Sequence, residues 1–228
     1  MIKKNLQTLL EKLPSEVKLV AVSKFHPVER LLEAYDGGQR IFGENRPQEL
    51  ASKVPQMPSD VQWHFIGHLQ TNKLKLVLPY VSLVQSVDSR HLLGSIDKWG
   101  RDNGRVIDVL LELHLGAEVT KQGFTEEEIL STVSTGMPSP AEGVPPEYPN
   151  VRIRGLMGMA TNTEDEAVIE ADFARIEDLF RRIREVHPEL AGTFTELSIG
   201  MSGDWPVAVR HGATMVRIGT DIFGEREY

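Results

Sequence analysis

Short runs of β-branched and other apolar residues alternate along the chain with longer segments in which apolar residues recur every three or four positions. The short runs predict strands, because brief apolar runs bounded by turn-forming residues are typical of them. Most runs are almost continuously apolar, as expected of parallel strands that are covered on both faces. The eight predicted strands are Val17–Lys24, Arg40–Asn45, Val61–Gly67, Val81–Val87, Val106–Gly116, Val151–Ala160, Thr195–Ser202 and Thr214–Thr220.

The longer segments between these runs predict helices. Thr125 with Glu128 and Thr163 with Glu166 have the spacing of a capping box, in which each side chain accepts a backbone hydrogen bond at the start of a helix. The clearest amphipathic pattern follows the second pair. There a single apolar stripe runs through Ile169, Phe173, Ile176, Phe180 and Ile183.

Eight β/α units in 228 residues predict a (β/α)₈ TIM barrel that occupies residues 1–228 as a single domain, with the helices outside. An open, doubly wound sheet is the alternative. The segment 134–150 is rich in proline, glycine and serine and is predicted to be a surface loop. It is not expected to link two domains, because the β/α alternation resumes after it.

Composition and charge narrow the class of protein. Acidic residues outnumber basic ones by 33 to 25, so a nucleic acid has no general electrostatic reason to bind. The chain has 0 cysteines, which excludes disulfides and thiolate chemistry and favours a reducing compartment. Near the N-terminus, Leu6, Leu9, Leu10 and Leu13 recur at helical spacing and form no signal-peptide core, and no run is long enough to span a bilayer. We expect a cytoplasmic protein that does not enter membranes.

Ligands of TIM barrels lie at the C-terminal ends of the strands, so polar residues at those ends are the candidate site residues. Lys24 ends the first predicted strand and shares one face with Val20 and Val22. If that face lines the barrel, desolvation favours the neutral amine, which can attack a carbonyl. The alternative is a surface lysine whose alkyl chain packs on apolar neighbours.

Asn45 ends the second predicted strand and His64 lies within the third. Either side chain could donate a hydrogen bond to a ring substituent of a ligand, or could be an ordinary buried polar group with its own partners. His64 and His68 also have the spacing of an H-x-x-x-H metal motif. The segment is predicted to be strand and loop rather than helix, and Phe65 stands where H-E-x-x-H has glutamate, so we expect no metal there.

The last two predicted strands end in glycine and hydroxyl residues. The seventh ends in Met201 and Ser202, with Gly203 next, and the eighth ends in Gly219 and Thr220. In TIM barrels these two loops often bind phosphate through backbone N–H groups. Ordinary turn chemistry, with Asp204 as a helix N-cap, is the alternative.

A reactive lysine combined with a phosphate site suits pyridoxal phosphate (PLP), whose aldehyde needs an amine and whose phosphate needs hydrogen-bond donors. Arg217 lies two residues before Gly219, in a position to face the pyridine nitrogen. A site for a phosphorylated metabolite without a covalent link is the alternative if Lys24 is only structural.

At these residues the sequence resembles the pyridoxal phosphate homeostasis proteins, a family related to the N-terminal barrel of alanine racemase. The matching segments span nearly the whole chain in the family's order: AVSK, FGEN, WHFIGHLQTNK, KQGF, GLM, IGMSGDW and MVRIGTDIFG. The resemblance implies a Schiff base on Lys24, phosphate contacts from Ser202, Gly219 and Thr220, Arg217 at the ring nitrogen, and Asn45, His64 and Met201 along the ring.

Two segments depart from the family pattern. GENRPQE stands where GENYVQE is usual, which places Arg46 and Pro47 at the rim, and HLGAEVTKQGF replaces an Asn-Ser-type loop. Lys121 is retained, and the only role we assign to it is transient capture of the cofactor.

The resemblance implies binding of PLP and its buffering or delivery to PLP-dependent apo-enzymes, rather than turnover. We expect a monomer, because nothing in the sequence marks an interface. The competing hypothesis is a PLP-dependent amino-acid racemase. A guanidinium does not supply a proton to keep the pyridine nitrogen protonated, so Arg217 makes the ring a weak electron sink and disfavours racemisation. Alanine racemases also take a tyrosine from a β-domain after the barrel, whereas this sequence stops at Tyr228.

Overall fold

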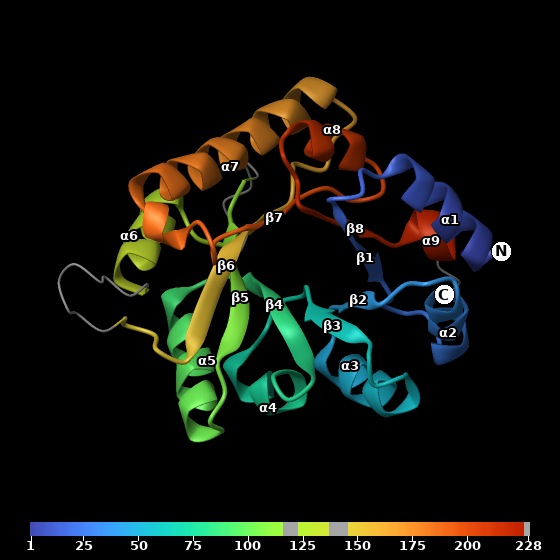
Figure 1. Cartoon of the computed structure of the whole chain (residues 1–228), viewed down its shortest axis with the longest axis horizontal. Coiled ribbons are helices and arrows are strands. Elements are labelled where there is room, and N and C mark those ends of the chain that lie inside the picture. The colour runs from blue at the N-terminus through green and yellow to red at the C-terminus, as the bar shows by residue number, and fades with distance from the viewer. Residues whose placement is uncertain (116–122, 137–145, 226–228) are drawn as a thin grey trace.

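Eight parallel strands close into a barrel in the computed structural model of the chain, which describes residues 1–115, 123–136 and 146–225. Each strand pairs with the next in the sequence, and β8 returns to pair with β1. Figure 1 shows the helices arranged around the outside of the strands. The (β/α)₈ prediction is confirmed, and closure excludes the open sheet. The strands are β1 (Lys18–Val22), β2 (Ile41–Glu44), β3 (Gln62–Phe65), β4 (Val81–Val87), β5 (Ile107–Leu113), β6 (Val151–Gly158), β7 (Glu196–Ser198) and β8 (Met215–Ile218).

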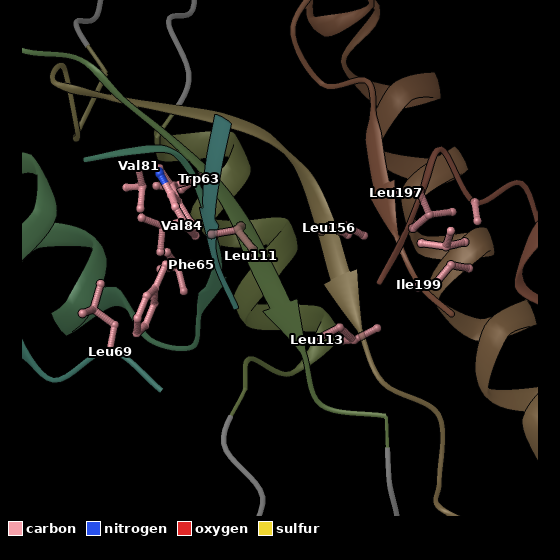
Figure 2. Packing of buried hydrophobic residues seen from close by; sticks show 14 of the residues in the cluster. Trp63, Phe65, Leu69, Val81, Val84, Leu111, Leu113, Leu156, Leu197 and Ile199 are labelled. Atoms are coloured by element: carbon pink, nitrogen blue, oxygen red, sulfur yellow. The ribbon is translucent and has the colours of Figure 1, made fainter. Parts of the chain in front are cut away.

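The strands are apolar on both faces because each face packs against a separate cluster of side chains. Residues that face the helices belong to the main core, and Figure 2 shows part of it, in which Trp63 and Phe65 of β3 pack beside Val81 and Val84 of β4. Alternate residues point inward. The smaller cluster that they form contains Val20, Leu83, Leu110, Met157 and Met215.

The helices follow from amphipathic segments and their caps. Thr125 and Glu128 form the predicted capping box, in which each side chain accepts a hydrogen bond from the other residue's backbone N–H. The helices are α1 (Ile2–Lys12), α2 (Val28–Asp36), α3 (Pro47–Lys53), α4 (Leu74–Val77), α5 (Arg90–Asp102), α6 (Glu126–Gly136), α7 (Glu166–Val186), α8 (Trp205–Arg210) and α9 (Thr220–Phe223), with short 3₁₀ turns at Val54–Gln56, Thr71–Lys73 and Pro188–Leu190.

The second capping box is absent. Asp165 is the N-cap of α7 and accepts a hydrogen bond from the N–H of Ala167, while Thr163 accepts one from the N–H of Asp165. Glu166 instead pairs with Arg210 of α8 at 2.7 Å. The apolar stripe of α7 packs on the barrel as predicted, although Ile169 is only partly buried.

Several strands end earlier than their apolar pattern suggests. β7 ends at Ser198 rather than Ser202, because the chain turns at Gly200, where φ is 92° and a Cβ would lie 2.6 Å from the Cβ of Ala208. The first three residues of the predicted loop 134–150 belong to α6, which runs to Gly136, and residues 137–145 lie outside the described residues. Within the described ranges, no helix combines the length and apolar character that crossing a membrane requires.

Candidate functional site

A cavity of about 290 Å³ opens at the C-terminal ends of the strands. All the residues that the sequence analysis singled out as ligand contacts line it, except His64. The set that comes together comprises Lys24, Asn45, Met201, Ser202, Arg217, Gly219 and Thr220. Their positions in the sequence span almost the whole chain, so closure of the barrel is what assembles them.

Lys24 reaches this cavity because of its register on β1. Val20 points into the barrel interior, and Val22 and Lys24 follow at the strand period and line the cavity above it. The next residue, Phe25, has a left-handed backbone with φ of 67°. It is the only non-glycine residue with positive φ in the described ranges, and it directly follows the candidate nucleophile.

Asn45 follows β2 and presents its side-chain amide to the cavity. Its Oδ1 atom is buried and accepts no hydrogen bond within the described part of the chain, so the amide has bonding capacity left for a ligand. The loop after β3 passes very close to Asn45 at Gly67. A side chain at position 67 would clash, because a Cβ there would lie 2.3 Å from the carbonyl oxygen of Asn45.

His64 lies elsewhere. It points into the barrel from β3 and lines a different cavity, of about 410 Å³, at the N-terminal ends of the strands. Burial lowers the pKa of His64 to about 3, with a smaller contribution from the charge of Lys18. His64 therefore lies apart from the cavity that the other predicted ligand contacts line.

The two histidines of the H-x-x-x-H spacing have separate partners. The Nδ1 atom of His64 lies 2.8 Å from Nε2 of Gln85, and Nδ1 of His68 lies 3.0 Å from Oδ2 of Asp88. No cluster of three or more potential metal ligands occurs in the described ranges.

Arg217 is the most deeply buried charged residue of the cavity, at 4% exposure. Its guanidinium donates to the carbonyl oxygen and the hydroxyl of Ser198 and to the carbonyl oxygen of Gly158. The Ser198 hydroxyl donates in turn to Oε1 of Gln85 at 2.6 Å. Burial lowers the pKa of Arg217 to about 10, which still leaves it protonated near neutral pH. The guanidinium is thus a fixed hydrogen-bond donor.

The loops after β7 and β8 supply the remaining polar groups. Backbone N–H groups of Ser202, Gly203 and Thr220 donate to no acceptor within the described residues, and the hydroxyls of Ser202 and Thr220 stand beside them. Asp204 occupies the N-cap position of α8, but its Oδ1 accepts from the N–H of Met201 and makes no capping bond. These unpaired donors can bind an anion.

A second cavity, of about 400 Å³, adjoins the first at the ends of β5, β6 and β7 and shares Met159, Met201 and Gly203 with it. Glu112 lines this cavity, and burial raises its pKa to about 7 against the opposing charge of Arg217. Burial also raises the pKa of Asp204 above its usual range.

Sequence reasoning missed Glu112 and the polar chain from Arg217 through Ser198 to Gln85. It also missed a cluster of charged side chains beneath Lys24, formed by Lys53 with Glu44 and Glu49. The available signal was a polar residue inside an otherwise apolar strand, as in VSLVQSV and TELSIG. Lys121 lies outside the described residues.

The closed barrel, the lysine at its mouth and the buried arginine define a class of protein. Residues 1–227 match the family model described as the alanine racemase N-terminal domain. Within that class, the curated relatives carry a more specific name. A pyridoxal phosphate homeostasis protein of Aquifex aeolicus is 38% identical over 92% of this chain and 88% of the relative, and one of Vibrio alginolyticus is 36% identical over 94% and 89%.

A solved structure is also similar to this chain over nearly its whole length. PipY of Synechococcus elongatus, with PLP bound, superimposes with a TM-score of 0.86 at 35% identity, covering 98% of this chain and 100% of that one. The chain belongs to the pyridoxal phosphate homeostasis protein family.

Proposed function

We propose that this chain binds PLP in the cavity at the C-terminal ends of its strands, holds it as a Schiff base on Lys24, and buffers it or delivers it to PLP-dependent apo-enzymes. The observation that carries the proposal is that one cavity of about 290 Å³ is lined by an amine, a fixed guanidinium and backbone N–H groups that have no acceptor in the described part of the chain. The names of the relatives and the PLP-bound structure of PipY support it.

The residues present fit this cofactor. Within the described residues, Asn45 has a buried oxygen without a hydrogen-bond partner, and the backbone N–H groups of Ser202, Gly203 and Thr220 have no acceptor. When bound, PLP supplies an aldehyde that condenses with amines and a ring that accepts electrons. On this assignment Lys24 provides the amine, the loops after β7 and β8 hold the phosphate, and Arg217 donates to the pyridine nitrogen.

Two further parts of the proposal concern context. We propose that the protein works in the cytoplasm, which the absence of cysteine supports, and that it acts as a monomer. Size-exclusion chromatography with light scattering would test the second point, since a dimer of the holo-protein would contradict it.

Peptide mapping after borohydride reduction tests the covalent link. Protein that has been incubated with PLP and reduced is expected to carry its pyridoxyl group on Lys24, and Lys24→Met is expected to lose both the label and the visible absorbance band. Lys75→Met, which removes an exposed lysine of α4, is the matched control and should label as wild type. A label found only on Lys121 or on surface lysines would overturn the assignment.

A further inference from the structure

A buried cluster of charged side chains lies beneath Lys24. Lys53, the last residue of α3, is 5% exposed, and its Nζ atom lies 2.6 Å from Oε1 of Glu44 and 2.6 Å from Oε1 of Glu49. The same ammonium donates to the carbonyl oxygen of Ser23 at 2.8 Å. Ser23 also donates its hydroxyl to Glu44 at 2.7 Å. The residue before Lys24 is therefore held by two members of the cluster.

The residue after Lys24 is held by the third member. The N–H of Phe25 donates to Oε1 of Glu49 at 2.6 Å, so one carboxylate oxygen bridges this amide and the Lys53 ammonium. Phe25 is where the backbone adopts φ of 67°, a conformation that is unfavourable for a residue with a Cβ. The Phe25 side chain is 41% exposed, and the guanidinium of Arg46 lies over its ring at 4.4 Å.

Stability alone is a weak explanation for the cluster. Glu44 is 0% exposed and its Oε2 atom has no hydrogen-bond partner within the described residues. A buried ionic cluster is often no more stabilising than well-packed apolar side chains of similar size, because desolvation of the charges offsets their attraction. What the cluster does contribute is geometry. Its hydrogen bonds fix the carbonyl before Lys24 and the amide after it.

We propose that Glu49, held by Lys53, is a positioning residue for Lys24, because its hydrogen bond to the Phe25 amide stabilises the left-handed turn that directs the lysine into the cavity. The inference rests on the proposed link between Lys24 and PLP. Glu49 itself does not line the cavity, so its effect passes through the backbone.

The test measures the rate at which PLP becomes attached to Lys24, by stopped-flow absorbance and by borohydride trapping with peptide mapping. Glu49→Ala removes the acceptor and should slow attachment about tenfold, the effect of leaving the Phe25 N–H without an acceptor. Glu49→Gln keeps an acceptor oxygen and should retain most of the rate. Gln48→Ala, at an exposed position of α3 next to Glu49, is the matched control and should match wild type.

Rescue separates positioning from general destabilisation. Glycine adopts positive φ without the Cβ penalty, so Phe25→Gly in the Glu49→Ala background should restore most of the rate. Phe25→Ala in the same background removes the ring, including its contact with Arg46, but keeps the penalty, and should not restore it. Melting temperatures without PLP, measured for every variant, show how much of any change is loss of folded protein.

The outcomes are distinct. Wild-type protein without a label on Lys24 overturns the proposed function. Label on Lys24 of wild type, combined with an unchanged rate in folded Glu49→Ala, overturns the positioning role alone. Equal rescue by Phe25→Gly and Phe25→Ala also overturns it, since the backbone conformation would then not be what Glu49 controls. If Glu49→Ala does not fold, a tenfold loss in Glu49→Gln would likewise contradict the proposal, because that variant keeps the acceptor.

Discussion

The Ser202 hydroxyl is the side-chain donor that the proposed phosphate site takes from the loop after β7. It lines the cavity beside the N–H groups of Ser202 and Gly203, for which the described ranges hold no acceptor. Removing one hydrogen bond to a charged group costs about 1.5–3 kcal/mol, or roughly ten- to a hundredfold in affinity. We therefore expect Ser202→Ala to weaken PLP binding by that factor.

Unphosphorylated pyridoxal is the control ligand for this prediction, because it carries the ring and the aldehyde without the phosphate. Isothermal titration with both ligands should show a large loss for PLP and little change for pyridoxal. Equal losses would mean that Ser202 acts on the ring or on folding, and the phosphate assignment would then be wrong.

At the same scale, the sequence could identify residues of the site only where position along a strand settles the direction of the side chain. Lys24 and Ser202 end predicted strands, and both reach the cavity. His64 lies in mid-strand, where the same inward direction leads to the opposite cavity. Glu49 accepts a hydrogen bond from the Phe25 amide across from helix α3, and nothing in the pattern of strands indicates such a contact.

At the scale of elements, the start of α7 shows how two polar signals compete. Asp165 caps the helix, whereas Thr163 accepts only from Asp165 and Glu166 pairs with Arg210. Loss of an N-cap costs about 1 kcal/mol, which lowers the melting temperature of a chain of this size by roughly 2–4 °C. We expect that shift for Asp165→Ala in thermal unfolding followed by circular dichroism.

Thr163→Ala is the matched variant and should lower the melting temperature less than Asp165→Ala does, because its hydroxyl bonds outside the helix. A larger effect of Thr163→Ala would contradict the Asp165 cap and support the capping box that the spacing of Thr163 and Glu166 predicts. The ambiguity is physical, since threonine and aspartate both satisfy the N-terminal donors and only the backbone path decides between them.

Strand ends were the least predictable feature of the elements. An apolar pattern indicates which residues are buried, whereas a strand ends where its hydrogen bonds to the neighbouring strands end. Where the chain turns over the mouth of the barrel, residues beyond that point are still buried. Ile199 is fully buried although β7 has already ended at Ser198. The loops that line the cavity start between the last paired residue of a strand and the end of its apolar run. The apolar pattern therefore predicts the position of these loops to within a few residues but not their conformation.

At the scale of the whole molecule, the repeated β/α alternation predicted the class of fold. Closure of the sheet into a barrel depends on contacts between residues that are distant in the sequence. Lys18 pairs with Met215 and Ala21 with Ile218, and this ladder between β1 and β8 distinguishes a barrel from an open sheet. Both arrangements contain the same alternating elements, so local pattern alone could not choose between them.

The assembled site also allows a prediction about turnover. Inverting an α-carbon requires proton donors on both faces of a planar centre, and Lys24 can serve one face. Arg217 keeps its proton, since its pKa remains about 10 despite burial. Among the described residues, Tyr35 bonds to Asp60, and neither Tyr80 nor Tyr148 lines either cavity at the barrel mouth. We expect exchange of the α-proton to be faster than inversion.

Incubating the PLP-loaded protein with L-alanine in deuterium oxide measures both rates, deuterium by mass spectrometry and chirality by chiral chromatography. A positioned general acid or base contributes typically 10²–10⁴-fold. Because none of the described tyrosines lines either cavity, inversion should be slower than exchange by a factor of that order. D-alanine that appears as fast as deuterium enters would contradict this and support the racemase alternative. Glu112 would then be the first residue to substitute, because its carboxyl lines the adjoining cavity and its pKa, about 7, suits proton transfer at neutral pH.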